Sequence, residues 1–80
     1  MTTWFVYLLR TADGKVYTGC TNDIDERIRR HNSGLVEFTR PRLPIQPLLI
    51  VTFFDKYRAY DFERYLKSGS GKEFSRRHFL

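Results

Sequence analysis

The stretch VYTGCTNDIDERIRRH, residues 16–31, decides the fold, because it holds the end of one strand and the start of one helix. Its polar and acidic middle section favours a helix start. The helix that follows carries Arg27 and His31 one turn apart. Ile24, Ile28 and His31 fall on one stripe at about 100° per residue. A guanidinium and an imidazole are therefore expected at the border of the helix face that meets the core.

A hairpin is predicted around the first part of this stretch. Residues 4–11 are apolar on both faces of a strand, which is typical of a central strand. Asp13-Gly14 is a two-residue turn signal, and residues 15–20 supply the returning strand. Alternation predicts one set of residues on a common face of each strand: Phe5, Tyr7 and Leu9, and Lys15, Tyr17 and Gly19.

The rest of the chain is expected to form further helices and one more strand. In order these are a helix over 22–33, a proline-containing loop over 35–47, a strand over 47–54, a helix over 56–67 and a short helix within 73–80. Thr21 or Asn22 is the expected cap of the first helix. The sequence SGSGK, residues 68–72, is expected to end the second.

The length and composition predict one small domain over residues 1–80 and exclude several classes of protein. Apolar residues make up 41% of the chain and aromatic residues 16%, which argues against disorder. The sequence has a single cysteine, Cys20, which excludes an internal disulfide. One cysteine and two histidines are also too few ligands for a typical structural zinc site. No apolar run approaches the roughly 20 residues of a membrane span, and the N-terminus lacks the features of a signal peptide. We therefore expect a cytoplasmic location and no membrane partner.

The net charge of +5 indicates an anionic partner. Most of the basic residues are arginines, whose planar fork of donors fits a phosphate group with two hydrogen bonds. Nucleic acid is the commonest partner of such a surface. The expected phosphate contacts outside any chemical site are Arg40, Arg42, Arg76 and Arg77.

The second helix repeats the arrangement of the first. Ala59, Phe62 and Leu66 form its apolar stripe, and Glu63 lies at the edge of the stripe. Gly19 removes a side chain from the face of Tyr17, and a glycine inside a strand often marks close approach by a ligand. We therefore expect five side chains to converge on one open concavity, with Glu63 on the same side of the sheet as Tyr17: Tyr7, Tyr17, Arg27, His31 and Glu63.

A structural interpretation of the same residues stays open. In it Arg27 and Glu63 form a salt bridge and His31 is a hydrogen-bonded core histidine. The two strand tyrosines then pack as ordinary strand aromatics.

FVY at residues 5–7 and YTG at residues 17–19 resemble the paired motif of the GIY-YIG nuclease superfamily. The resemblance extends to Arg27, His31 and Glu63, covers nearly the whole chain, and is closest in pattern to small stand-alone bacterial members. It implies an α+β fold with a three-stranded antiparallel sheet flanked by helices. It also implies metal-dependent hydrolysis of phosphodiester bonds. Phe5 and Thr18 differ from the motif. Family members often place an asparagine after the glutamate helix, and here that role is either vacant or taken by a serine within residues 68–75.

The resemblance also implies a role for each site residue. Tyr7 and Tyr17 are the motif tyrosines, Arg27 the catalytic arginine and His31 its helical neighbour. Glu63 is the ligand of Mg²⁺ or Mn²⁺, which is commonly held by one or two carboxylates with water and phosphate oxygens. Arg27 would stabilise charge on the phosphoryl oxygens. We expect an acidified Tyr7 to accept a proton from the attacking water, with Tyr17 orienting water or phosphate and His31 holding the phenolic proton.

Three functions remain open from the sequence. The first is an endonuclease acting on DNA rather than RNA, structure-directed or weakly specific, and targeted by a protein partner where it needs one. The second is a nucleic-acid-binding module of the same fold that does not cut. The third is a small basic domain that docks an acidic protein. Glu63 favours the first function over the second, because a binding module has no need of that carboxylate.

Overall fold

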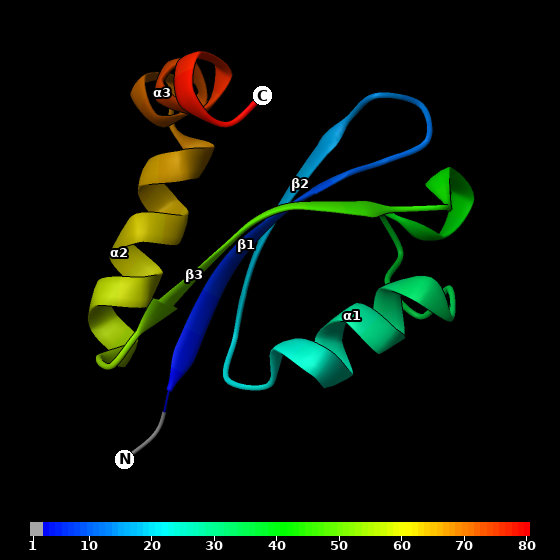
Figure 1. The fold of residues 1–80 in the computed structure, drawn as a ribbon, viewed down its shortest axis with the longest axis horizontal. Helices are drawn as coiled ribbons and strands as arrows, with labels where there is room; N and C mark the ends of the chain where they lie inside the picture. Colours follow the sequence, from blue (N-terminus) through cyan, green and yellow to red (C-terminus); the bar gives the residue numbers. More distant parts are fainter. Residues whose placement is uncertain (1–2) are drawn as a thin grey trace.

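The computed structural model describes residues 3–80 and shows a three-stranded antiparallel sheet with helices on both sides (Figure 1). The chain forms, in order, β1 (Trp4–Arg10), β2 (Val16–Thr21), α1 (Ile24–Asn32), a 3₁₀ turn (Arg40–Arg42), β3 (Gln46–Phe53), α2 (Lys56–Lys67) and α3 (Gly69–His78). The strand order is β2-β1-β3, so β1 is central, as predicted. The α+β class and the antiparallel sheet are confirmed. Within residues 3–80, no helix has the length and apolar character to cross a membrane.

The β1–β2 hairpin forms at the predicted turn. Gly14 has φ +85°, a left-handed conformation that other residues adopt only with strain. Thr11 accepts a bond from the Gly14 amide at 3.0 Å and donates its own amide to Lys15 O at 2.9 Å. The register that follows places Tyr7 opposite Gly19 and Leu9 opposite Tyr17. The expected common face of Tyr7, Tyr17 and Gly19 is therefore confirmed.

The central strand is buried on both faces by different helices. Val6 and Leu8 pack with Ala59 and Leu66 of α2. Tyr7, on the other face, contacts α1 through His31. Figure 1 shows α1 on one side of the sheet and α2 with α3 on the other. Alternate residues of one strand thus join two separate layers.

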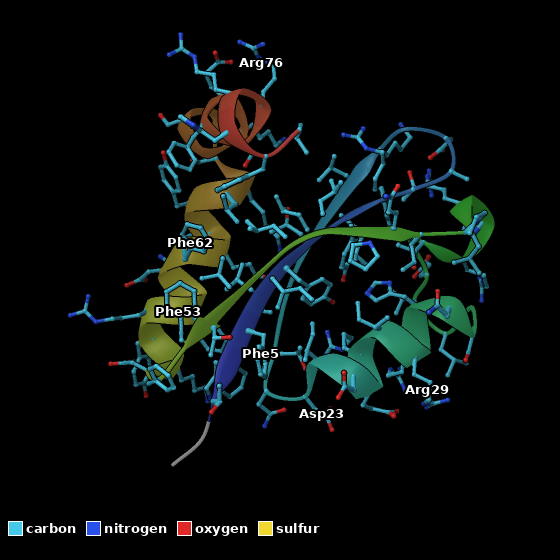
Figure 2. The ribbon with its side chains drawn as sticks, in the orientation of Figure 1. Phe5, Asp23, Arg29, Phe53, Phe62 and Arg76 are labelled. Carbon is cyan, nitrogen blue, oxygen red and sulfur yellow. The ribbon has the colours of Figure 1, made fainter. Side chains whose placement is uncertain are left out.

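The third strand is less buried than its apolar sequence predicts. It is an edge strand, and Ile50 remains 46% exposed on the face shared with Tyr7. Its other face is covered by α2, where the rings of Phe53 and Phe62 pack with centroids 5.5 Å apart (Figure 2).

The first helix begins one residue later than the expected caps. Asp23 is the cap, and its Oδ1 accepts a bond from the Glu26 amide at 3.1 Å. Thr21, an expected cap, instead accepts a bond from the Asp23 amide and so holds the capping residue in place. The helix ends at Ser33 and Gly34, as predicted, and Gly34 has φ +74°.

The prediction that residues 68–72 only end a helix is wrong. Ser68 terminates α2 and also caps α3, which begins at Gly69 rather than near residue 73. Its Oγ accepts a bond from the Gly71 amide at 3.1 Å and donates to Tyr65 O at 2.6 Å. A β-carbon at Gly71 would lie 1.7 Å from Tyr65 O. The two helices can therefore join at one residue only because Gly71 has no side chain.

This junction predicts opposite effects for two neighbouring glycines. Gly71→Ala should lower the free energy of unfolding by about 1–3 kcal/mol, because the methyl group overlaps backbone that cannot move alone. Gly69→Ala is the matched control, since a β-carbon there meets nothing within 4 Å. It should be neutral or stabilising by up to about 1 kcal/mol. Urea unfolding of both variants is the measurement, and equal stabilities would contradict this account of the junction.

Candidate functional site

A buried chain of hydrogen bonds joins β1, α1 and the loop after α1. The Tyr7 hydroxyl lies 3.1 Å from His31 Nε2, and His31 Nδ1 lies 2.8 Å from Thr39 Oγ1. The Thr39 hydroxyl donates to Val36 O at 3.5 Å. All polar groups are satisfied when Nδ1–H donates to Thr39 and Nε2 accepts the Tyr7 proton. Neutral His31 therefore holds the phenolic proton of Tyr7 in a fixed direction.

The pKa of Tyr7 differs from the prediction. Burial raises the pKa of Tyr7 to about 12, Tyr17 adds to the rise, and Arg27 only partly opposes it. The side chain of Tyr7 is fully buried. The pKa of Tyr7 is therefore raised and not lowered in the protein on its own, and acidification of Tyr7 beside a bound metal ion stays a prediction. Burial, and then the charge of Arg27, lower the pKa of His31.

Tyr17 is the motif tyrosine that reaches the surface. It is half-buried, and its ring contacts His31 edge-on with centroids 4.8 Å apart. The Tyr7 ring lies 6.1 Å from it. His31 thus packs against both tyrosines and holds the plane of the Tyr17 ring.

Gly19 has a structural explanation. A β-carbon at this position would lie 2.3 Å from the hydroxyl end of the Tyr7 ring. The close approach that the sequence pointed to is thus made by Tyr7 itself and not by a ligand. Contact between Gly19 and a substrate stays a prediction.

Arg27 and Glu63 lie on the two sides of the edge strand. Cys20 of β2 is near both. Burial is the main cause that raises the pKa of its thiol, the charge of Glu63 raises it further, and the charge of Arg27 lowers it. Arg27 also lies close enough to Tyr7 to act on its hydroxyl. The Glu63 side chain is 23% exposed, and its Oε2 accepts a bond from Lys67 Nζ at 3.1 Å. No Arg27–Glu63 ion pair forms among the described residues.

The expectation that Glu63 lies on the same side of the sheet as Tyr17 is therefore wrong. Tyr7, Tyr17 and His31 lie on the face covered by α1, whereas Glu63 belongs to α2 on the opposite face. The reason is that a helical wheel shows which side of a helix is buried but not which face of the sheet buries it. Because β2 is an edge strand with nothing beyond it, groups from both faces approach one another around that edge.

The four outer arginines differ in their contacts. Arg42 lies over the Phe38 ring at 4.3 Å, donates to Phe38 O at 2.6 Å, and pairs with Asp13 through an Nε–Oδ2 distance of 3.2 Å that lacks hydrogen-bond alignment. Arg76 and Arg77 both pair with Glu73, at 2.6 and 3.3 Å. Arg40 has no ion pair within residues 3–80. Phosphate binding by these four stays a prediction, and Arg42 already has a structural role.

The described residues hold no cluster of three or more metal-ligating side chains, whether histidine, cysteine, aspartate or glutamate. Glu63 is partly exposed at the sheet edge, and one carboxylate suits Mg²⁺ only when water and substrate oxygens complete the shell. Glu63 fits that type of site once its carboxylate leaves Lys67.

Sequence reasoning missed two residues of this region. Thr39 is fully buried and holds His31, yet it stands in a proline-containing loop with no periodicity to mark it. Ser75 is the serine of the 68–75 segment that is buried, and its Oγ has no hydrogen-bond partner within residues 3–80. Only the resemblance, which leaves a place for an asparagine in that segment, pointed toward such a residue.

Comparisons with known proteins identify the family to which the chain belongs. The UPF0213 protein YhbQ of Escherichia coli strain K12 and that of Shigella boydii serotype 18 are each 59% identical to this chain over 34 residues, or 42% of this chain. That match spans only 34%, about a third, of the length of each relative. The solution NMR structure of the UPF0213 protein BH0048 from Bacillus halodurans is 36% identical, with a TM-score of 0.60 over 94% of this chain and 83% of that chain. The model of the GIY-YIG catalytic domain matches residues 3–77, so the chain belongs to the GIY-YIG catalytic domain family.

Proposed function

We propose that this protein is a metal-dependent endonuclease that hydrolyses phosphodiester bonds in DNA, with the reacting phosphate at the open edge of β2. The observation that carries the proposal is the set of groups around that edge. Half-buried Tyr17 stands on that strand beside His31, and the opposite charges of Arg27 and Glu63 both reach Cys20 of the same strand. Membership of the GIY-YIG catalytic domain family supports the same activity.

Each of these groups has a chemical task in phosphodiester hydrolysis. Arg27 would stabilise the charge that develops on the phosphoryl oxygens, which is often the largest single contribution to catalysis. Glu63 would hold Mg²⁺ or Mn²⁺ together with water and phosphate oxygens. When bound, such an ion polarises a phosphoryl oxygen as a Lewis acid.

The two tyrosines would have different tasks. The Tyr17 hydroxyl, which reaches the surface, would orient the attacking water or the phosphate. Tyr7 is buried with a raised pKa, so its task would be to position the neighbouring ring through His31. Tyr17 thus keeps the task that the sequence predicted for it, whereas Tyr7 no longer has the predicted task of accepting the proton of the attacking water.

A binding module that does not cut is the second candidate, because Lys67 occupies the Glu63 carboxylate in this structure. One assay separates the two functions. Purified protein is incubated with labelled single-stranded, duplex and branched DNA, with Mg²⁺, with Mn²⁺ and with chelator. An endonuclease cuts at least one of them only when metal is present, whereas a binding module retains DNA and cuts none.

Replacing Glu63 should separate cleavage from binding. Glu63→Gln keeps the size of the side chain but removes the charge that holds a metal ion, so cleavage should fall on the order of a hundredfold or more. Binding measured in chelator should change little. Asp61→Asn is the matched control, since Asp61 is an exposed carboxylate on the same helix that pairs with Arg64. An unchanged cleavage rate in Glu63→Gln would rule out the metal-binding role.

Removing the Tyr17 hydroxyl should slow cleavage on the order of a hundredfold, because its task of orienting the reacting groups is lost. Tyr17→Phe keeps the ring and its contact with His31, so the melting temperature should stay close to that of the native protein. Tyr57→Phe, at a tyrosine 73% exposed on α2, should retain full activity. Single-turnover rates are the measurement, and equal rates for both variants would remove Tyr17 from the site.

The buried imidazole predicts an acid-sensitive fold. Because the folded pKa of His31 lies below its unfolded value, the unfolded chain binds the proton more readily. The free energy of unfolding should therefore fall as pH drops below about 6.5. The pKa values of Asp13, Glu26 and Glu73 are lowered in the folded state, so protonation of these carboxylates lowers the free energy of unfolding only below about pH 4.5. Urea unfolding between pH 5 and 8 measures this slope. It should vanish in His31→Gln and persist in His78→Gln, and a slope retained in His31→Gln would contradict the assignment.

A further inference from the structure

A cavity of about 570 Å³ opens between β2 and α3. Leu8 and Leu66 are buried, so they form its apolar floor together with Val16. The volume lies within the range of roughly 300–1,000 Å³ that is typical of small-molecule sites. Neither the core nor the hydrogen-bond chain of Tyr7 uses this space.

Aromatic rings stand at one side of the cavity. Tyr17 and Phe38 both line it, with ring centroids 5.9 Å apart and planes tilted by 36°. Phe38 is 39% exposed, and the Arg42 guanidinium covers part of its ring. Exposed aromatic side chains next to cations are the surfaces on which unpaired nucleobases stack.

A buried hydroxyl without a partner lies in the same wall. Ser75 is only 5% exposed and lines the cavity, and its Oγ makes no hydrogen bond within residues 3–80. Buried polar groups are almost always hydrogen-bonded. The Oγ is shielded from solvent in the free protein, so a turn of the Ser75 side chain about its Cα–Cβ bond would be needed to aim it at the polar edge of a ligand in the cavity.

The charge around the cavity is of one sign. Lys67, Lys72 and Arg76 line it, and none of its lining residues is acidic. Lys67 pairs with Glu63, and Arg76, labelled on α3 in Figure 2, pairs with Glu73. Lys72 has no ion pair among the described residues. The cavity thus combines an apolar floor, an aromatic wall and a cationic rim, which is complementary to a flat base joined to a phosphate.

Two residues connect the cavity to the proposed phosphodiester site. Tyr17 contacts His31 and also lines the cavity. Lys67, also in its lining, holds the Glu63 carboxylate. A ligand in the cavity would therefore lie beside both the tyrosine and the carboxylate of the proposed site.

We propose that this cavity binds one unstacked nucleotide of the nucleic-acid substrate. The base lies on Leu8 and Leu66 beside the aromatic rings, the Ser75 hydroxyl bonds its polar edge, and Lys72 and Arg76 hold its phosphate. The proposal rests on the proposed function for the nature of the substrate. A base stacked within a duplex has to leave its neighbours to enter, so the preferred substrates carry an unpaired nucleotide.

The first test measures binding without cleavage, in chelator. The probes are labelled pentathymidylate, the same strand with its central base removed, and a blunt duplex with only paired bases. The native protein should bind pentathymidylate on the order of tenfold more tightly than the abasic strand, because the sugar-phosphate chain is the same and only stacking is lost. Equal binding of the normal and abasic strands would overturn the proposal, as would tighter binding of the duplex.

Matched variants locate the contact. Arg76→Ala and Arg64→Ala each remove one exposed arginine that pairs with a carboxylate on its own helix, but only Arg76 lines the cavity. Affinity for pentathymidylate should fall about tenfold in Arg76→Ala and about twofold or less in Arg64→Ala. Equal losses would indicate general attraction to a basic surface and would overturn the proposal.

Ser75→Ala gives opposite effects on stability and binding. Removing an unpaired buried hydroxyl should raise the melting temperature of the free protein, while loss of the bond to the base should weaken pentathymidylate binding several-fold. A stabilised variant with unchanged affinity would remove Ser75 from the proposed contact set. A polyglutamate peptide that displaces the strand at equal charge concentration would assign the cavity to an acidic protein instead and overturn the proposal.

The outcomes separate this proposal from the proposed nuclease activity. Cleavage that requires metal, together with equal binding of normal and abasic strands, would retain the nuclease and reject the nucleotide cavity. Base-dependent binding that is lost in Arg76→Ala, without cleavage of any DNA, would retain the cavity and reject the nuclease.

Discussion

The contact between the Tyr7 ring and the bare backbone of Gly19 is the constraint on which the rest of the structure depends. A β-carbon at residue 19 would lie 2.3 Å from that ring. The absence of a side chain lets the hydroxyl of a central strand reach His31 on α1 at 3.1 Å, and His31 in turn holds Thr39 of the following loop. One glycine thus allows a single buried chain of hydrogen bonds to join a strand, a helix and a loop. Because every polar group in this chain of hydrogen bonds has a partner, the bonds make the sheet face beneath Tyr17 rigid.

Most elements could be predicted because their signals are local. The Asp13-Gly14 turn, the apolar run of β1 and the Asn32-Ser33-Gly34 stop each depend on a few neighbouring residues. The α2–α3 junction could not, because Gly71 is explained only by the Tyr65 carbonyl that packs against it. Glycine and serine are common in flexible segments as well as at helix ends, and the sequence does not separate the two uses.

The candidate site was predicted as a set of residues but not as a shape. Helical periodicity identified His31 and Glu63 as members of inward-facing borders. It carried no information on which face of the sheet each helix covers. Burial also acted against the predicted chemistry, since desolvation of the Tyr7 hydroxyl outweighs the nearby charge of Arg27 and raises the pKa to about 12. The more exposed Tyr17, at the edge strand, became the better candidate for contact with a substrate.

A domain of this size has little stability to spare, which gives the cavity beside Tyr17 a further meaning. Folded domains are stable by only about 5–15 kcal/mol, and small ones bury less of their surface than large ones. A buried hydroxyl without a partner costs about 1–3 kcal/mol, a substantial part of that total. The Ser75 Oγ is such a hydroxyl, and Ser75 lines the cavity. A ligand that enters this space would hydrogen-bond the hydroxyl, cover the apolar floor and contact the cations at the rim. The features that destabilise the free protein would therefore all stabilise the complex.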